Sequence, residues 1–368
     1  MSVPSRIGRI ALVGIPVVSL LAFAFAMATH PPTPILIALG VLLIAAVFTA
    51  VHHAELIAAR LGEPFGSLVL ALSVTVAEGG MILTLMLSSP ETTTTLARDA
   101  VFAAIMLICN GIVGVSLILK SLVRRTAVFN PEGVSGALAA IAVLTTLTLV
   151  FPSLTHSAGN GLFSPFQLTF VAVVSLVLYL VFVFVQTIRH RDFFIAPEVQ
   201  GMPEKYSNPT SHEHRPSKKA ALRSVVLLLI SLVSVVGLAE VTTPVLKSTI
   251  LGAGLPIGLV AVSISFIVLL PEAISAIRAA VYGRSQTSLN LAYGSAMATI
   301  GLTIPLVSIA SLIFGLPLVL GLGPSDIVLL MLTIVVSILT VIPGKATVLQ
   351  GAVHLCILGG FLVFVLQP

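Results

Sequence analysis

Charged residues are scarce in this chain: Asp, Glu, Lys and Arg together make up 8% of its 368 residues. Soluble domains carry roughly 25% charged residues, because ionic groups cover their water-facing surface. This chain cannot cover a folded surface in that way. Its residues are 57% hydrophobic, and the mean hydropathy is +1.16. The composition therefore excludes a soluble fold and predicts a protein embedded in a membrane.

Tryptophan is absent and cysteine is rare. The two cysteines, Cys109 and Cys356, lie inside apolar runs with no CxxC motif and no histidine at metal-ligand spacing. We therefore expect neither a disulfide nor a metal-thiolate site. The net charge of +5 does not indicate nucleic-acid binding, because no Lys/Arg cluster alternates with stacking aromatic residues. No cofactor is expected.

Apolar runs of about twenty residues dominate the chain, and this is the length of a helix that crosses a bilayer. Barrel strands would instead alternate apolar and polar residues over about ten positions. The predicted fold class is all-α, a polytopic membrane protein with about 11 transmembrane helices. The expected spans are 8–29, 34–58, 64–88, 98–122, 133–152, 165–188, 221–242, 254–281, 287–313, 324–343 and 346–366.

The distribution of basic residues orients these spans. With a cytoplasmic N-terminus, every Lys and Arg except Arg98 and Lys247 falls inside, as the positive-inside rule requires. The C-terminus is then outside, and we expect a location in the bacterial inner membrane. A secretory signal peptide is the alternative for the first span, because Ala26-Met27-Ala28 resembles a cleavage site. The length of the apolar stretch 10–28 favours a retained helix.

A hydrophilic segment at 189–220 divides the helices and is expected in the cytoplasm. Its His212, Glu213 and His214 have two interpretations, a metal-sensing patch and a solvated loop, and the solvated loop is favoured. The expected organisation is an N-terminal transmembrane helix at 1–33, a first five-helix repeat at 34–188, the loop at 189–220, and a second five-helix repeat at 221–368.

The two halves of the chain share a pattern. A Gly-x-Pro-x-Gly motif at 62–66 and another at 254–258 each open a helix that leads to a glutamate, Glu78 or Glu272. An odd number of spans separates the two copies, so they have opposite orientations in the membrane. Inverted repeats are typical of secondary transporters, which bind their substrate near the midplane between the halves. Neither a channel nor an intramembrane enzyme requires this symmetry.

Glu78 and Glu272 are the acidic residues that lie well inside their spans. The other acids fall at helix ends or in loops, and Glu240 lies near the outer end of its helix. A charge at the bilayer centre costs several kcal/mol, and no basic residue lies at matching depth. Protonation can neutralise each carboxylate, and the two together can balance one divalent cation. This pair favours a cation/proton exchanger over two hydrogen-bonded core residues.

Hydroxyl and amide side chains near the glutamates would complete an oxygen-rich site, since Ca²⁺ takes roughly six to eight oxygen ligands. Some lie one helical turn from a glutamate, and others come from crossing helices. The expected metal ligands are Glu78, Glu272, Asn110, Ser295, Thr299 and Thr75. The accessory candidates are Ser275, Glu240, His52 and Glu55.

Two further features accompany these ligands. Pro271 and Gly79-Gly80 adjoin the glutamates, so their helices are expected to loosen there and release carbonyl oxygens. The His52-His53-Ala54-Glu55 run lies near the cytoplasmic end of the second span. It suits either proton handling or simple hydration at the interface, and hydration is favoured. His354 is expected to be a hydrogen-bonded core residue.

Several stretches resemble the alpha-repeats of the cation/calcium exchanger superfamily, and among its members the bacterial ChaA-type calcium/proton antiporters are most similar. They are LGEPFGSLVLALSVTVAE ending at Glu78, RDAVFAAIMLICNGIVG around Asn110, and LLPEAISAIRAA around Glu272, followed by QTSLNLAYGSAMATIGLTIP. The resemblance covers most of the chain. It implies that one glutamate per repeat is a shared ligand of Ca²⁺ and H⁺, here Glu78 and Glu272.

The sequence departs from the family pattern at two places. Many relatives have a Gln in a Gly-Ser-Ser-Ile-Gln run, whereas 294–298 reads Gly-Ser-Ala-Met-Ala. Ala77 precedes Glu78 where plant-type members have Gly-Asn. ChaA-type proteins are also linked to Na⁺ and K⁺ exchange, so these departures bear on ion selectivity.

We therefore expect a secondary active transporter, not an enzyme, that exchanges Ca²⁺ for H⁺ by alternating access in a lipid bilayer. The first alternative is a Na⁺/H⁺ or K⁺/H⁺ antiporter on the same fold. A cation channel is the alternative from another class, and the inverted repeat argues against it. An intramembrane hydrolase would need a metal-ligand or nucleophile-base motif that the sequence lacks.

Overall fold

The computed structural model describes residues 6–29, 31–61, 65–88, 94–155, 159, 161–194 and 216–367. These residues are mostly helical, because a backbone in hydrocarbon must satisfy its amide groups internally. Eleven helical spans follow one another in these ranges, and they match the eleven expected from the sequence. The spans are α1 (Arg6–Thr29), α2 (Thr33–Leu61), α3 (Phe65–Ser88), α4–η2–α5 (Leu96–Met106, Leu107–Ile112, Val113–Arg124), α6–η3–α7 (Pro131–Thr145, Thr146–Val150, Phe151–Leu154), α8–η4 (Pro165–Phe184, Val185–Arg189), α9 (Lys218–Gly252), α10 (Gly258–Val281), α11–η7–α12 (Ser285–Ala298, Thr299–Thr303, Ile304–Phe314), α13 (Pro324–Val341) and α14 (Val348–Leu366).

Length and apolarity qualify ten of these helices, among the described residues, to cross a membrane. The remaining span is α3, a 24-residue helix with an apolar stretch at Leu72–Leu87. Four helix starts in the described ranges carry a capping side chain: Asn130 and Ser217 cap α6 and α9, and Ser164 and Thr347 form capping boxes at α8 and α14. The protein is therefore a polytopic helical membrane protein. Residues 62–64 and 195–215, which include the predicted His212–His214 patch, lie outside the described ranges.

The seventh span is longer than predicted. The sequence predicts a helix over 221–242, but α9 continues through Pro244 to Gly252. A proline inside a helix removes one backbone hydrogen bond. Next to it, the hydroxyl groups of Thr242 and Thr243 donate to the carbonyl oxygens of Leu238 and Ala239, both at 2.7 Å. These bonds hold the helix together where the proline weakens it, so the chain does not turn there.

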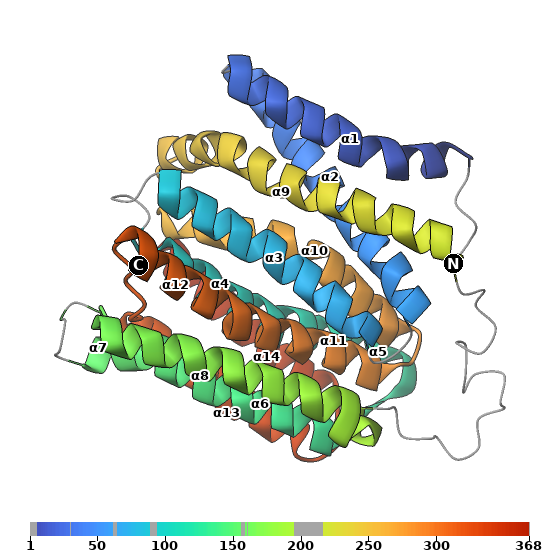
Figure 1. Ribbon diagram of the computed structural model, residues 1–368. Coiled ribbons are helices and arrows are strands. Elements are labelled where there is room, and N and C mark those ends of the chain that lie inside the picture. Colours follow the sequence, from blue (N-terminus) through green and yellow to red (C-terminus); the bar gives the residue numbers. More distant parts are fainter. Residues whose placement is uncertain are drawn as a thin grey trace.

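Two pairs of loops fix which helix ends lie together. The short strands β1 (Ala127–Val128) and β2 (Lys345–Ala346) pair antiparallel and join the loop after α5 to the loop after α13. A bridge between Leu162 and Val319 joins two loops at the other end of the bundle. The termini also lie at opposite ends (Figure 1). An odd number of spans produces this arrangement.

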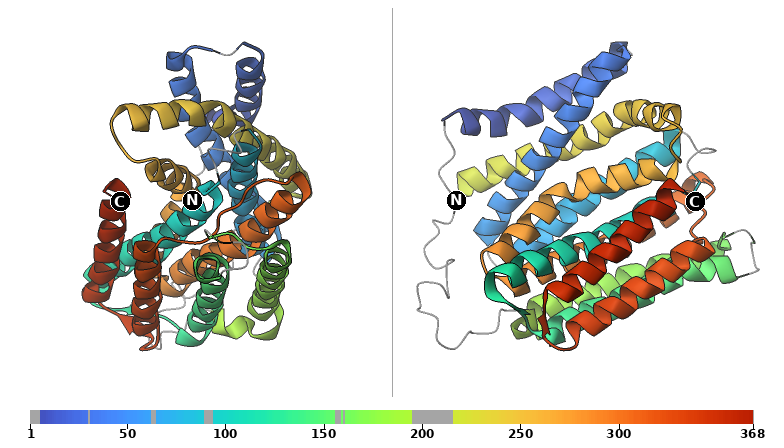
Figure 2. Two further views of the ribbon diagram at one scale, coloured as in Figure 1. Left: turned by 90° about the vertical axis from the view of Figure 1, so that its left-hand side faces the viewer. Right: turned by 180° about the vertical axis from the view of Figure 1, so that it is seen from behind.

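The buried side chains form two hydrophobic clusters. One is built mainly from α1, α2, α3 and α9, and the other mainly from α4, α6, α8 and α11 to α14. Helices α3 and α10 contribute to both, for example through Met81 and Ile82 of α3. The two glutamate helices therefore lie at the seam between the clusters, in the middle of the bundle (Figures 1 and 2).

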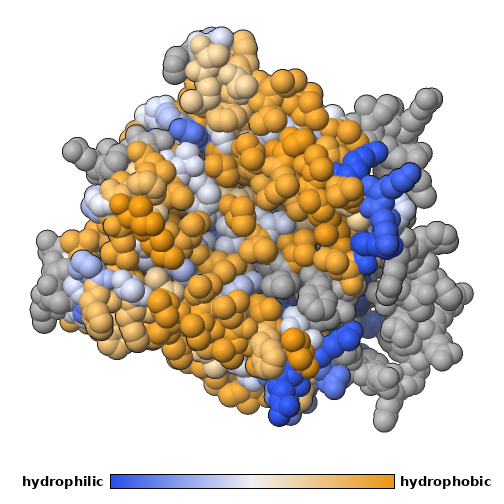
Figure 3. Space-filling model, viewed as in Figure 1, coloured by the Kyte–Doolittle hydropathy of each residue, from blue (hydrophilic) through white to orange (hydrophobic). Residues whose placement is uncertain are grey.

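The outer surface suits a bilayer. Its visible face is largely apolar, and hydrophilic residues gather at the end that holds the N-terminus (Figure 3). Helix α1 packs against α2 and α9. Proline 16 removes the backbone donor for the carbonyl of Leu12, and His53 Nε2 on α2 donates to that oxygen at 3.0 Å. In this structure, then, the first span is an integrated helix of the bundle.

Candidate functional site

Glu78 and Glu272 occupy matching places in the two halves. Each lies near the middle of a 24-residue helix, Glu78 on α3 and Glu272 on α10. Their exposed fractions are 2% and 6%, and the two carboxyl groups are close enough to interact electrostatically. Among the described residues, neither has a Lys or Arg partner at ion-pair distance. The structure thus brings two uncompensated acids, one from each repeat, into one buried place.

A single crossing helix supplies hydroxyl groups to both acids. The Ser295 hydroxyl on α11 donates to Glu272 Oε2, and the Thr299 hydroxyl on η7 donates to Glu78 Oε2 at 2.9 Å. Residues four apart share a helix face, so these two hydroxyls lie in line. Ser295 thus bonds the acid of its own half, and Thr299 bonds the acid of the other half. This one helix therefore contacts the acids of both repeats at the site.

A third hydroxyl was not identified from the sequence. Thr303 lies one turn after Thr299, and a Cβ built on Gly79 would lie 3.8 Å from Thr303 Oγ1. Among the described residues, neither Thr303 Oγ1 nor Glu78 Oε1 has a hydrogen-bond partner, although both are buried. Each of these oxygens has lone pairs with which it can contact a cation. The spacing of Thr299 and Thr303 on one helix face is the signal that could have identified this residue.

The glutamate helices do not loosen where the sequence suggested. Helix α3 runs through Gly79-Gly80 and α10 runs through Pro271 without interruption. The two glycines instead permit close packing: a Cβ on Gly79 would meet Leu306 Cδ2 at 2.7 Å, and one on Gly80 would meet Val236 Cγ2 at 2.9 Å. Loosened turns occur in the crossing helices, as the π-helical segments η2 and η7. Such segments are frequent at functional sites.

Asn110 does not contact the glutamates. It lies on η2 and is 0% exposed, and its amide group donates to Thr333 Oγ1 at 2.9 Å. Its Oδ1 lies 3.1 Å from His354 Nδ1. The predicted role of Asn110 as an oxygen ligand at the site therefore finds no counterpart in this arrangement. Thr75 is buried on α3, one turn before Glu78.

Among the accessory candidates, Ser275 and Glu55 contact each other. The Ser275 hydroxyl on α10 donates to Glu55 Oε1 on α2 at 3.4 Å, instead of turning to Glu272, and the Arg278 charge acts on the same carboxyl group. His52 is half-buried beside His53, with ring centroids 5.6 Å apart. Glu240 is partly buried on α9. Glu55 and Ser275 thus link α2 to the glutamate helix α10.

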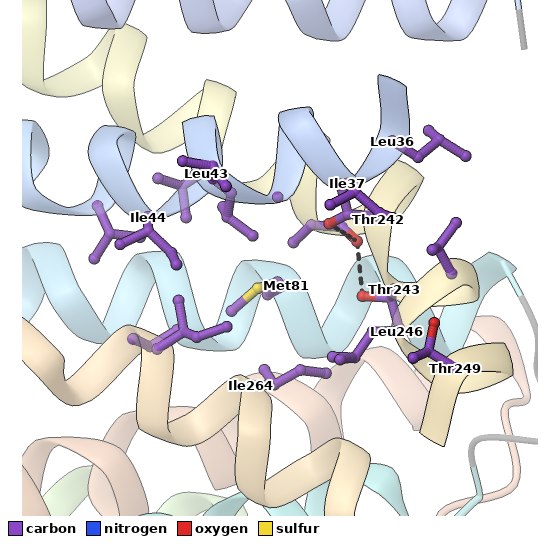
Figure 4. Close-up of a pocket in the computed structure, with 18 residues that line it drawn as sticks. Leu36, Ile37, Leu43, Ile44, Met81, Thr242, Thr243, Leu246, Thr249 and Ile264 are labelled. Atoms are coloured by element: carbon purple, nitrogen blue, oxygen red, sulfur yellow. Dashed lines mark hydrogen bonds between the residues drawn. The ribbon is translucent and has the colours of Figure 1, made fainter. Parts of the chain in front are cut away.

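An apolar cavity of about 280 Å³ lies between α2, α3, α9 and α10. Leu43 and Ile44 of α2 lie across it from Met81 and Ile264 (Figure 4). Met81 is one turn from Glu78 along α3, so the cavity lies beside the acids without including them. Its walls are too apolar to replace the hydration shell of a cation. This cavity is therefore not a candidate ion site, whereas the glutamate pair is one.

Comparisons with known proteins show the family to which the chain is similar. The model of the sodium/calcium exchanger protein family matches residues 32–188 and 223–367. The chain is 43% identical to the putative ionic transporter y4hA of Sinorhizobium fredii over 327 residues, 89% of this chain and 87% of that protein. It is 30% identical to the sodium-potassium/proton antiporter ChaA of Escherichia coli over 352 residues, 95% of this chain and 94% of that protein.

Solved structures share the fold. The H⁺/Ca²⁺ exchanger CAX superposes with a TM-score of 0.72 at 18% identity, over 97% of this chain and 88% of that one. Native YfkE superposes with a TM-score of 0.69 at 15% identity, over 97% of this chain and 100% of that one. At these identities the likeness concerns the fold.

Proposed function

The chain belongs to the sodium/calcium exchanger protein family, and from that premise we propose that it is a proton-coupled antiporter whose cargo is Ca²⁺. One observation carries the proposal: Glu78 and Glu272 lie together in the seam, buried and without a basic partner among the described residues. Two carboxylates balance the charge of one divalent cation. When the cation leaves, protons neutralise the same two groups, because an uncompensated charge is costly in the membrane interior.

Competition for one pair of groups is the coupling mechanism. The carboxylates bind either Ca²⁺ or protons, so each ion leaves only as the other arrives. Ser295 and Thr299 serve both states, since a hydroxyl group donates to a carboxylate and also offers its own lone pairs to a cation. With few other oxygen donors close to the acids, bound water would complete the coordination of Ca²⁺.

Alternating access follows from the position of the site. Helices α3 and α10 lie between the two hydrophobic clusters, so a movement of one cluster against the other would open the seam to one side at a time. We infer that the end rich in basic residues faces the cytoplasm of a bacterial inner membrane. Protons entering from outside would then drive Ca²⁺ outward. The Glu55–Ser275 contact joins α2 of one cluster to the seam helix α10, so it would break if these two helices moved apart.

A monovalent cargo is the second candidate. The Escherichia coli relative is named for sodium and potassium exchange, and it matches most of the chain. Among the described residues no group of three or more His, Cys, Asp or Glu surrounds a common point, so the site holds two acids and no third. Two carboxylates can also accept one Na⁺ or K⁺ together with one proton.

Proton flux in vesicles tests the proposal. The purified protein is reconstituted into proteoliposomes with an acidic interior and a pH-sensitive dye, and CaCl₂, NaCl or KCl is added separately, with choline chloride as the control salt. We expect Ca²⁺ to release protons from the interior. Proton release by Na⁺ or K⁺ but not by Ca²⁺ would establish the monovalent alternative. Cation flux without proton movement would indicate a channel. If none of the three salts releases protons, antiport is refuted.

Replacement of Thr299 by valine tests the hydroxyl contact. Thr299→Val keeps the volume of the side chain but removes the donor to Glu78 Oε2. A hydrogen bond to a charged group contributes about 1.5–3 kcal/mol, so we expect the apparent KM for the cation to rise on the order of tenfold. Thr299→Ser keeps the hydroxyl and should stay near the wild-type KM. Equal KM values for the two variants would show that the contact does not contribute to binding.

A further inference from the structure

A buried polar network links the last helix to the middle of the first repeat. His354 on α14 is 0% exposed, and both ring nitrogens have partners: Nδ1 lies 3.1 Å from Asn110 Oδ1, and Nε2 lies 3.1 Å from Thr340 Oγ1. The Asn110 amide nitrogen donates to Thr333 at 2.9 Å. The network thus spans η2, α13 and α14, and its members are 0–3% exposed.

The donor and acceptor pattern fixes which nitrogen of a neutral imidazole carries the hydrogen. An amide oxygen can only accept, so Nδ1 of His354 carries the hydrogen that bonds to Asn110. Nε2 is then the acceptor for the Thr340 hydroxyl. A neutral ring in this one tautomer satisfies every contact, as a buried polar network requires. An alanine at this position would leave the Asn110 oxygen and the Thr340 hydroxyl without their partner.

Asn110 connects this network to the ion site. It lies in the π-helical segment η2, which packs against α10, α11 and α14. Helix α10 carries Glu272, and α11 carries Ser295, which donates to Glu272. A displacement of η2 would therefore shift two elements that define the position of that carboxyl group. The hydrogen bonds of Asn110 to His354 and Thr333 hold η2 against α14 and α13.

We propose that His354 is a positioning residue of the exchanger, which fixes Asn110 and the η2 segment and thereby sets the geometry of the Glu272–Ser295 half of the ion site. This inference rests on the proposed cation/proton exchange. His354 itself neither touches the ion nor carries a transported proton. The last helix, which contributes no side chain to the glutamate pair among the described residues, thus controls cation affinity from a distance.

The test compares His354→Ala with His354→Gln in the proteoliposome assay. Alanine removes both hydrogen bonds, whereas glutamine retains one donor and one acceptor but cannot titrate. We expect His354→Ala to raise the apparent KM for the cation on the order of tenfold, with a maximal rate within about twofold of wild type. His354→Gln should restore the KM to within about threefold. Ser175→Ala, a buried serine on α8 outside the network, should leave the KM unchanged.

A double variant separates positioning from general stability. If His354 acts through Asn110, the KM of the combined His354→Ala/Asn110→Ala variant should not exceed that of the more impaired single variant. Additive effects on the KM, or a wild-type KM in His354→Ala, would overturn the inference while leaving the proposed function intact. Absence of exchange by the wild-type protein would instead overturn the proposed function. Thr340→Val removes one bond only and serves as the test if His354→Ala does not fold.

Discussion

Replacing Glu272 by glutamine should abolish cation/proton exchange while leaving the protein folded. Glutamine has nearly the same shape, and its amide oxygen can still accept the hydroxyl of Ser295. It can neither balance a cation nor carry a proton. Removing one partner from a buried, charge-compensated site costs about 3–5 kcal/mol, so we expect exchange to fall by at least about 100-fold. Initial rates of cation-driven proton release in proteoliposomes give the measurement.

The matched control for this variant is Glu132→Gln. Glu132 lies in the first turn of α6, away from the glutamate pair, so its loss should not change the rate by more than about twofold. Glu78→Gln should be as inactive as Glu272→Gln, because the two acids act as one site. A variant of either glutamate that exchanges ions within about threefold of wild type would refute the shared-carboxylate mechanism.

The spans and the two acids could be predicted because both depend on properties that are local in the sequence. A run of apolar residues sets the length of a helix that can cross the bilayer. The cost of burying a charge singles out Glu78 and Glu272 wherever the other helices lie. Ser295 and Thr299 were also predicted beside them, since they follow the second glutamate on the next span and share a helix face.

The sequence was less informative about contacts between distant segments. The amide of Asn110 could bond to the glutamates or to any polar group on another helix, and its partner His354 lies 244 residues away. Nothing in the pattern distinguishes these choices. The glycines after Glu78 were likewise ambiguous, because a small residue permits both a loosened turn and close packing. Packing against Leu306 and Val236 decided between them.

At the junction of α14 with α5, a single added methyl group should cause a large loss of stability. A Cβ built on Gly351 would lie 2.7 Å from Ile118 Cγ1, 2.8 Å from Gly114 O and 3.0 Å from Ile118 N. Two of these atoms belong to the backbone and cannot rotate away. Gly351→Ala must therefore push the two helices apart, and overpacking of this kind costs typically about 1–3 kcal/mol.

Gly359 and Gly360 on the same helix provide the control for Gly351→Ala, since a Cβ at either position has nothing within 4 Å. Alanine there should be neutral or slightly stabilising, because it favours the helix over glycine. Thermal unfolding in detergent, followed by size-exclusion chromatography, measures all three variants.

His354 lies one turn after Gly351 on α14, so the displaced helix should also lose its bond to Asn110. We therefore expect Gly351→Ala to lower the melting temperature and to raise the cation KM together. Thermal stability equal to that of Gly359→Ala would show that the two helices are not in close contact at Gly351.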